Sequence, residues 1–260
     1  MQPLTYLFVP GDRPDRFDKA AQAGAGAIVL DLEDAVLPAA KPQAREAICE
    51  WFARDAARAA HAVVRIASEA DLPVLAQAGV RTVMLPKAES VSQVRSTVQA
   101  GVNVIALIET ARGVRDVDAI AEAQGVIRLA FGTLDYAVDI GVADNERALL
   151  YPASRLVLAS RCAGLPAPIA GVTTAIDDEA QLRADVAWER SLGFGAKLLV
   201  HPRQVAAVHA AMRPSGEDVA WARRIVAAAE AARGGAVQVD GRMVDRPVIL
   251  KAQAILERIP

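Results

Sequence analysis

Length, composition and charge exclude several classes of protein. The 260 residues include 29 Lys and Arg and 31 Asp and Glu, which gives a net charge of −2, and 53% of the residues are hydrophobic. This composition argues against an intrinsically disordered chain, and the balanced charge argues against a nucleic-acid binder. The length fits one large domain or two small ones, and single α/β barrels commonly reach about 250 residues.

Cysteine usage and apolar runs indicate a cytoplasmic location. Cys49 and Cys162 are isolated and form no CxxC motif, so we expect neither a disulfide framework nor a structural zinc site. The chain starts with MQPL, which lacks the basic and apolar regions of a signal peptide. No apolar run approaches the roughly 20 residues that cross a bilayer, so no membrane partner is expected.

Short apolar runs alternate with longer amphipathic stretches along most of the chain. The runs are rich in Val, Ile and Leu and lack strict alternation, which is typical of parallel strands buried on both faces. Eight such units in about 210 residues predict a (β/α)8 barrel. An open doubly wound sheet is the alternative, but its glycine-rich phosphate turn is not visible. The expected strands are Leu4–Val9, Ala27–Leu30, Ala62–Ile66, Thr82–Leu85, Val102–Ile108, Ile127–Phe131, Ala167–Ala170 and Ala196–Val200, and the expected helices include Arg45–Ala57, Val91–Ala100, Ala148–Ala163 and Asp178–Leu192.

The strand–helix rhythm stops after Pro214. We therefore predict a barrel domain over residues 1–213 and a C-terminal extension over residues 214–260, which exceeds what a barrel needs. The elements predicted for this extension are a helix over Gly216–Arg233, a turn at Gly234-Gly235, a short strand over Ala236–Val239 and a final helix over Val248–Arg258.

Charged residues collect where the expected strands end. In a (β/α)8 barrel the active site lies at the C-terminal ends of the strands, and five of these ends carry a carboxylate. Like charges in a low-dielectric cleft repel each other strongly, and a hard divalent cation is the simplest relief. Salt bridges to Arg65, Lys87 and Arg112 are the alternative. The carboxylates expected to crowd together are Asp31, Glu33, Asp34, Glu109 and Asp135.

The positions of these carboxylates suggest two roles around such an ion. Glu109 and Asp135 lie directly at strand ends, so we assign them as ligands of Mg²⁺, with Mn²⁺ as a second possibility. Asp31, Glu33 and Asp34 are expected to hold water molecules that are bound to the ion.

Other residues at the same strand ends are candidates for substrate binding. Arg65 suits bidentate binding of a carboxylate, and neutralising the acidic cluster is an equal alternative. Gly132 and Thr133 follow the sixth strand and are expected to contact substrate. Arg13 and Lys19 cluster after the first strand, where they either meet phosphates or form a solvated face.

These residues lie within longer stretches that occur in order along nearly the whole chain. They include LFVPGDRPDRFDKA at Leu7–Ala20, VLDLEDAV at Val29–Val36, ALIETARGV at Ala106–Val114, FGTLDYAVDIG at Phe131–Gly141 and GRMVDRPVILKA at Gly241–Ala252. In these stretches the chain resembles the citrate lyase beta-subunit-like proteins. These are relatives of the malyl-CoA, methylmalyl-CoA and citramalyl-CoA lyases in the HpcH/HpaI aldolase superfamily.

The resemblance implies a magnesium-dependent barrel, usually trimeric, that acts on acyl-CoA thioesters. It implies that Glu109 and Asp135 are the magnesium ligands and that Arg65 is the clamp on the carboxylate of a 2-keto acid. By the same resemblance, Glu33 and Asp34 hold water molecules next to the ion.

Further roles also come from the resemblance. Arg13 and Lys19 resemble positions that meet the phosphates of coenzyme A, and Asp245 resembles a catalytic aspartate that reaches a neighbouring subunit's site. The extension is therefore expected to pack on a neighbouring subunit. One departure lies beside the predicted clamp, where Ala67-Ser68-Glu69 and a short loop replace the Asn and longer loop common in the family.

The resemblance predicts cleavage of a 3-hydroxy-3-carboxy-acyl-CoA of the malyl-, methylmalyl-, citramalyl- or citryl-CoA type to a 2-keto acid and an acyl-CoA. Three alternatives stay open. The first is a citrate lyase beta subunit that acts on a citryl thioester of an acyl-carrier protein. The second is an aldolase that uses a free keto acid without a thioester, and the third is a non-catalytic binding protein. A homotrimer or homohexamer is the expected assembly.

Overall fold

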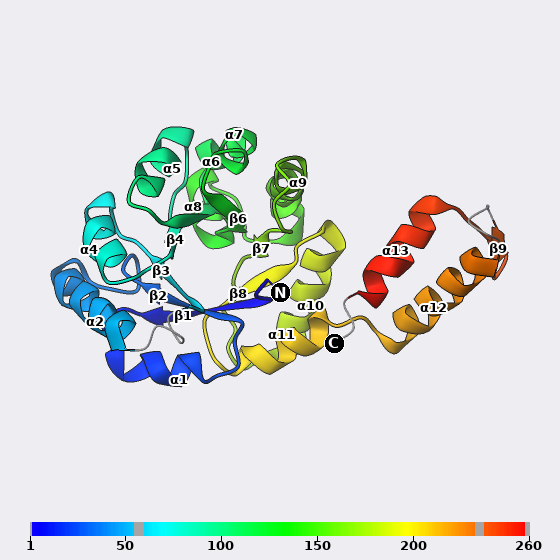
Figure 1. Cartoon of the computed structure of the whole chain (residues 1–260), viewed down its shortest axis with the longest axis horizontal. Helices are drawn as coiled ribbons and strands as arrows, with labels where there is room; N and C mark the ends of the chain where they lie inside the picture. The colour runs from blue at the N-terminus through cyan, green and yellow to red at the C-terminus, as the bar shows by residue number, and fades with distance from the viewer. Residues whose placement is uncertain (1, 55–59, 232–236, 258–260) are drawn as a thin grey trace. The chain divides into compact units, whose positions relative to one another are not determined.

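A computed structural model describes residues 2–54, 60–231 and 237–257. Eight parallel strands form a closed barrel in which each strand pairs with the next and β8 pairs with β1 (Figure 1). The predicted (β/α)8 barrel is confirmed, and the closed sheet excludes the doubly wound alternative. The strands are β1 Thr5–Pro10, β2 Ala27–Asp31, β3 Ala62–Arg65, β4 Thr82–Leu85, β5 Asn103–Ile108, β6 Val126–Phe131, β7 Ile169–Ala170 and β8 Ala196–Leu199.

Helices follow the strands and surround the barrel (Figure 1). Each of the four helices expected from the sequence is present. The predicted end of the first of them at Ala57 lies outside the described residues. The helices are α1 Phe17–Ala21, α2 Lys41–Arg54, α4 Leu72–Gln77, α5 Val91–Val98, α6 Ala111–Arg115, α7 Val117–Ala121, α8 Thr133–Ile140, α9 Glu146–Cys162, α10 Glu179–Leu192 and α11 Gln204–Met212, with single 3₁₀ turns at Pro14–Arg16, Pro38–Ala40 and Glu69–Asp71.

The seventh strand is shorter than predicted. The sequence predicts a strand over Ala167–Ala170, whereas β7 contains only Ile169 and Ala170. Pro166 and Pro168 have no backbone N–H, so the chain before Ile169 cannot donate the hydrogen bonds of a ladder at those positions. β7 therefore joins its neighbours through few backbone contacts.

Alternate residues of each strand fill the barrel interior with a cluster of buried apolar side chains. Because successive side chains of a strand point to opposite faces, residues two positions apart share a face. Val29 in this cluster is followed two positions later by Asp31, and Leu107 is followed by Glu109. Val63 of the same cluster is likewise followed two positions later by Arg65, the last residue of β3. The charged residues therefore form the next inward-facing layer at the C-terminal mouth of the barrel.

The chain divides into two compact units, residues 1–209 and 210–260. In the second unit, α12 (Gly216–Ala231) packs against α13 (Arg246–Leu256). A small core of Ala222, Ile225, Val244 and Ala252 joins these helices to a hairpin.

That hairpin contains a strand that the sequence did not predict. β9 (Val237–Val239) pairs antiparallel with β10 (Arg242–Val244). Asp240 and Gly241 connect the strands, and both have a positive φ, 51° and 75°, as two-residue hairpin turns require.

Several predictions for the extension fall elsewhere. The helix end at Arg233, the turn at Gly234-Gly235, the strand start at Ala236 and the helix end at Arg258 lie outside the described residues. The domain limit at residue 213 and the packing of the extension on a neighbouring subunit stay predictions. Among the described helices, none is long and apolar enough to span a membrane.

Candidate active site

A cavity of about 360 Å³ lies at the C-terminal mouth of the barrel. Apolar side chains of the barrel interior, among them Phe8 and Leu107, form part of its wall. Its polar part consists largely of residues that the sequence predicted as site residues. These are Asp31, Asp34, Arg65, Glu109, Gly132, Thr133 and Asp135.

Arg65 is held by carboxylates on both sides. Its Nε and Nη2 donate to the two oxygens of Asp31 over 2.7 and 2.6 Å, and its Nη1 lies 3.0 Å from Oε2 of Glu33. Asp31 also accepts the backbone N–H groups of Glu33 and Ala35. Asp31 therefore orients Arg65 and the following loop, and its predicted contact with metal-bound water stays a prediction.

The structure shows one of the two roles considered for Arg65, the neutralisation of the acidic cluster. The second role stays a prediction, but the donors that it needs are present. A guanidinium has five N–H donors, and Asp31 accepts two of them. The guanidinium carbon lies 4.9 Å from the centre of the Phe8 ring, which helps to fix its plane at the edge of the cavity.

Glu109 is the most unusual carboxylate of the site. It is 1% exposed, and its Oε1 accepts the backbone N–H of Lys87 over 2.7 Å. A Cβ atom at Gly132 would lie 2.5 Å from Oε2, so only glycine leaves room for this carboxylate. Burial raises the pKa of Glu109 to about 8, and the negative charges of Glu33 and Asp135 act in the same direction. The nearby positive charge of Lys87 lowers the pKa of Glu109 but does not offset the effect of burial.

The surroundings of Glu109 fit a divalent cation. Asp135 is half-buried in the first turn of α8, lines the same cavity and interacts electrostatically with Glu109. Mg²⁺ commonly binds one or two protein carboxylates and completes its shell with water and substrate oxygens. Among the described residues, no group of three or more Asp, Glu, His or Cys side chains is placed to hold a metal ion, so an ion at Glu109 and Asp135 would need further ligands from water or substrate.

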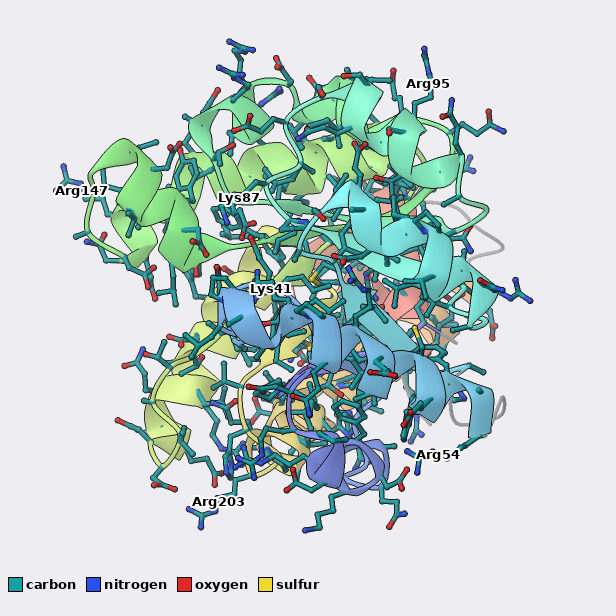
Figure 2. All side chains as sticks on the ribbon, turned by 90° about the vertical axis from the view of Figure 1, so that its left-hand side faces the viewer. Lys41, Arg54, Lys87, Arg95, Arg147 and Arg203 are labelled. Atoms are coloured by element: carbon teal, nitrogen blue, oxygen red, sulfur yellow. The ribbon has the colours of Figure 1, made fainter. Side chains whose placement is uncertain are left out.

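Lys87 is a residue whose importance the sequence did not reveal. Its φ of +46° places it in the left-handed region, which is rare for residues other than glycine and is often found at functional sites. In this conformation its backbone N–H reaches Glu109, and its Nζ donates to Oε1 of Glu33 over 2.6 Å. In the view of Figure 2, Lys87 lies inside the outline of the molecule, whereas Arg95 and Arg147 extend outward at its edges. The sequence indicated Lys87 only as a possible salt-bridge partner of the acidic cluster, which its ion pair with Glu33 confirms, and gave no sign of its backbone role.

The predicted phosphate-binding residues lie apart from the cavity lining. Arg13 is exposed and makes a two-point salt bridge to Asp15, with distances of 3.0 and 3.1 Å. Lys19 lies in α1 and is exposed. Both are accessible, as a phosphate contact requires, and that contact stays a prediction.

Asp245 caps the N-terminus of α13 in the second unit. Its side chain accepts the backbone N–H of Val248 over 3.4 Å, and it is half-buried. An N-cap aspartate stabilises its helix, so this residue has a local structural role. Its predicted catalytic role in a neighbouring subunit stays a prediction.

The fold and the charged cavity at its mouth define a barrel enzyme. The family model for HpcH/HpaI aldolase/citrate lyase matches residues 4–202. The chain belongs to the HpcH/HpaI aldolase/citrate lyase family and is a lyase of the citrate lyase beta-like type. This membership removes the alternative of a non-catalytic binding protein.

Similar proteins agree with this assignment. The chain is 40% identical to a citrate lyase subunit beta-like protein of Mycobacterium tuberculosis, over 97% of this chain and 94% of the relative. It is 29% identical to a (3S)-malyl-CoA thioesterase of Cereibacter sphaeroides, over 98% and 93%. The crystal structure of CitE from M. tuberculosis in complex with magnesium, acetoacetate and coenzyme A superimposes with a TM-score of 0.88 and 37% identity, covering 98% of this chain and 97% of the other.

Proposed function

We propose that the protein cleaves a 3-hydroxy-3-carboxy-acyl-CoA, of the malyl-, methylmalyl-, citramalyl- or citryl-CoA type, to a 2-keto acid and an acyl-CoA in a magnesium-dependent reaction. The observation that carries the proposal is Glu109, a buried carboxylate with a raised pKa that lines the same cavity as Asp135 and interacts with it electrostatically. The similar CitE structure contains magnesium, acetoacetate and coenzyme A, which supports a magnesium ion and a coenzyme A thioester as ligands here.

Glu109 and Asp135 would hold the ion, which is Mg²⁺ or, in its place, Mn²⁺. Glu33 and Asp34 would bind water molecules next to it. When bound, such an ion acts as a Lewis acid on the oxygen that becomes the keto carbonyl. The raised pKa of Glu109 means that the carboxylate must lose a proton when the ion enters.

Arg65 would select substrates that carry a carboxylate. Arg65 lines the cavity, Asp31 and Phe8 hold its guanidinium in place, and it has more N–H groups than the two that Asp31 accepts. Gly132 leaves space beside Glu109, and Thr133 lines the same wall, so both would contact the substrate. A thioester without this carboxylate would lose the contact with Arg65 and react slowly.

The thioester end would depend on residues outside the cavity. Arg13 and Lys19 would meet the phosphates of coenzyme A. During cleavage, the hydroxyl proton leaves to a base, the carbon–carbon bond breaks and its electron pair moves to the carbon next to the thioester. Asp245 of a neighbouring subunit would protonate that carbon, and in the reverse direction it would take the proton. This role requires an oligomer, for which we propose a homotrimer or homohexamer. The proposed location is the cytoplasm.

A thioester panel tests the proposal. Malyl-, methylmalyl-, citramalyl- and citryl-CoA are incubated with and without Mg²⁺, and the released keto acid is measured. We expect keto acid only with Mg²⁺, no activity in Glu109→Gln, and wild-type activity in Glu122→Gln, which alters an exposed carboxylate. Wild-type protein that releases no keto acid from any thioester would refute the proposal.

The thioesterase among the relatives favours a second candidate, hydrolysis of the thioester. The same panel separates the two reactions, because hydrolysis releases the free thiol of coenzyme A whereas carbon–carbon cleavage leaves the thioester intact. Turnover of free acyl-CoA without a partner argues against the reading as a beta subunit that needs an acyl-carrier protein. Aldol addition of a free keto acid to an aldehyde would instead favour the thioester-independent aldolase.

Mixed oligomers test Asp245. Asp245→Asn and Glu109→Gln chains are each expected to be nearly inactive alone, since each lacks a different part of the proposed site. When the two are mixed and reassembled, an intact arm from one chain can meet an intact barrel from the other, so activity returns. If mixing restores no activity although the chains exchange, Asp245 does not act between subunits.

A further inference from the structure

A buried ion pair lies between β8 and α10, among residues to which the proposed reaction assigns no role. The side chain of Lys197 is 0% exposed, and its Nζ lies 2.6 Å from Oε1 of Glu189. Glu189 is also buried, and its Oε2 has no hydrogen-bond partner among the described residues. Removing such charges from water costs free energy that the pair only partly recovers. Stability alone therefore does not explain the pair.

The pair reaches the end of the weakest strand of the barrel. Lys197 Nζ also donates to the backbone carbonyl of Gly171 over 3.0 Å. Gly171 directly follows β7, which has two residues and little ladder bonding. The ammonium group therefore holds the carboxyl end of β7 where backbone hydrogen bonds are scarce.

Gly171 in turn sets one wall of the candidate active site. A Cβ atom on Gly171 would lie 2.7 Å from Oγ1 and 2.8 Å from Cγ2 of Thr133. Thr133 lines the cavity and begins α8, which carries Asp135 two residues later. The residue before it, Gly132, packs against Glu109. The backbone of Gly171 therefore supports the Gly132–Asp135 segment, which packs against Glu109 at one end and carries Asp135 at the other.

We propose that the Lys197–Glu189 pair positions the metal site by anchoring Gly171, against which Thr133 and the first turn of α8 rest. Neither residue of the pair touches metal or substrate, so both are positioning residues. The inference rests on the proposed role of Glu109 and Asp135 as metal ligands. It predicts that disturbing the pair, or the contact that it supports, weakens metal binding even when the barrel stays folded.

The first test removes both charges together. The double variant Lys197→Met, Glu189→Leu leaves no buried charge without a partner, and apolar replacement of a buried pair is often neutral for stability. Mn²⁺ binding is measured from the electron paramagnetic resonance signal of the free ion, and folding from the melting temperature. Outer contacts of metal ligands typically change metal affinity by about 10- to 100-fold, so we expect the Kd for Mn²⁺ to rise about tenfold with the fold retained. A folded double variant with a Kd within about twofold of wild type overturns the inference.

A pair of glycine variants tests the supported contact directly. Gly171→Ala adds a methyl group directly after β7, where it meets Thr133, and Gly195→Ala adds one directly before β8. At Gly195 the new Cβ would lie 2.8 Å from Cβ of Ala167, away from the cavity. We expect Gly171→Ala to raise the Kd for Mn²⁺ about tenfold and Gly195→Ala to leave it unchanged, with comparable losses in melting temperature. Equal Mn²⁺ affinities in the two variants overturn the inference, and this comparison decides the question if the double variant fails to fold.

Titration of the wild-type protein with Mn²⁺ distinguishes a failure of the proposed metal site from a failure of the positioning role. If wild-type protein binds no Mn²⁺, the proposed metal site fails and the inference fails with it. If wild-type protein binds Mn²⁺ and Gly171→Ala binds it equally well, the metal site stands and only the positioning role is lost.

Discussion

Two buried arginines occupy opposite ends of the same barrel, and their partners differ in kind. Arg65 at the C-terminal mouth is surrounded by the carboxylates of Asp31 and Glu33. Arg128 near the other end is 3% exposed and donates to the backbone carbonyls of Pro3 and Ala167, each over 2.8 Å. Each guanidinium also lies near an aromatic ring of β1.

The difference separates a functional charge from a structural one. Neutral carbonyls satisfy Arg128 and join segments distant in the sequence, so this arginine closes the end of the barrel. At the mouth, charged side chains gather around a cavity, and burial keeps the pKa of one of them, Glu109, raised although Lys87 acts in the opposite direction. Such an arrangement is costly for the chain alone and becomes favourable when ligands of suitable charge bind.

The largest expected effect is the loss of activity in Glu109→Gln, with the barrel still folded. Glu109→Gln removes a proposed metal ligand, so we expect Mg²⁺-dependent turnover to fall by about 10³-fold or more. The same substitution removes a buried charge, so at pH 8 the metal-free variant should melt at the same temperature as wild type or higher. Steady-state kinetics and thermal unfolding measure the two effects. A variant that loses stability in parallel with activity would show that Glu109 is part of the structural framework.

The comparison of the two arginines is tested by matched substitutions. Lysine keeps the charge but loses the planar fork. A hydrogen bond to a charged group contributes about 1.5–3 kcal/mol, so Arg65→Lys should lower kcat/KM by about 100-fold. Arg128→Lys should leave kcat/KM within about threefold but lower the melting temperature by several degrees, because a backbone carbonyl loses its donor. The reverse pattern in kinetics and melting would contradict the assignment of the two ends.

The pH dependence sharpens the same contrast. Because the pKa of Glu109 is about 8 in the folded chain and ordinarily 4.5, the folded chain keeps a proton that the unfolded chain releases. The stability of the metal-free protein should therefore decline as the pH rises from about 5 to 8, and the raised pKa values of Glu33 and Glu189, both buried, act in the same direction.

Metal binding should show the opposite trend. The ion requires the ionised carboxylate, so Mg²⁺ affinity should rise by up to about tenfold per pH unit between pH 6 and 8. Calorimetric titrations at several pH values, in buffers with different ionisation enthalpies, also measure the proton that is released. An affinity that stays flat over this range would show that Glu109 is already ionised in the metal-free protein.

The smallest expected effect concerns Lys87. Lys87→Gly keeps the backbone N–H that Glu109 accepts and relieves the positive φ, but it removes the Nζ contact with Glu33. The side chain is half exposed, so its ion pair contributes little to stability. We expect the melting temperature to change by only a few degrees and kcat/KM to fall by about threefold to tenfold. A loss as large as that of Glu109→Gln would assign the Lys87 side chain a direct part in the reaction.

Much of the barrel was predictable because buried parallel strands leave apolar runs in the sequence. The limits of β4 match the prediction, whereas β7 is shorter because Pro166 and Pro168 interrupt its ladder. The hairpin strand β10 was missed, although Asp240-Gly241 is a typical hairpin turn. Here the turn residues were a better signal than the apolar pattern.

The site was predictable as a set of residues but not as a set of contacts. Because parallel strands end at one mouth, the charged residues that follow them must gather there. The pairing of Arg65 with Asp31 depends on the register of β2 and β3, which places the two residues directly opposite each other. The role of Lys87 depends on a backbone conformation that its residue type does not indicate.

The contact between Glu109 and the backbone of Lys87 has a consequence for how this site can evolve. Every residue except proline carries the N–H group that orients Glu109, so any residue that tolerates the positive φ at position 87 can alter the charge beside Glu33 without redirecting this carboxylate. Substrate preference could therefore drift through such exchanges while the chemical centre persists. Substitutions at position 87 can thus change the surroundings of the site while the orientation of Glu109 stays the same.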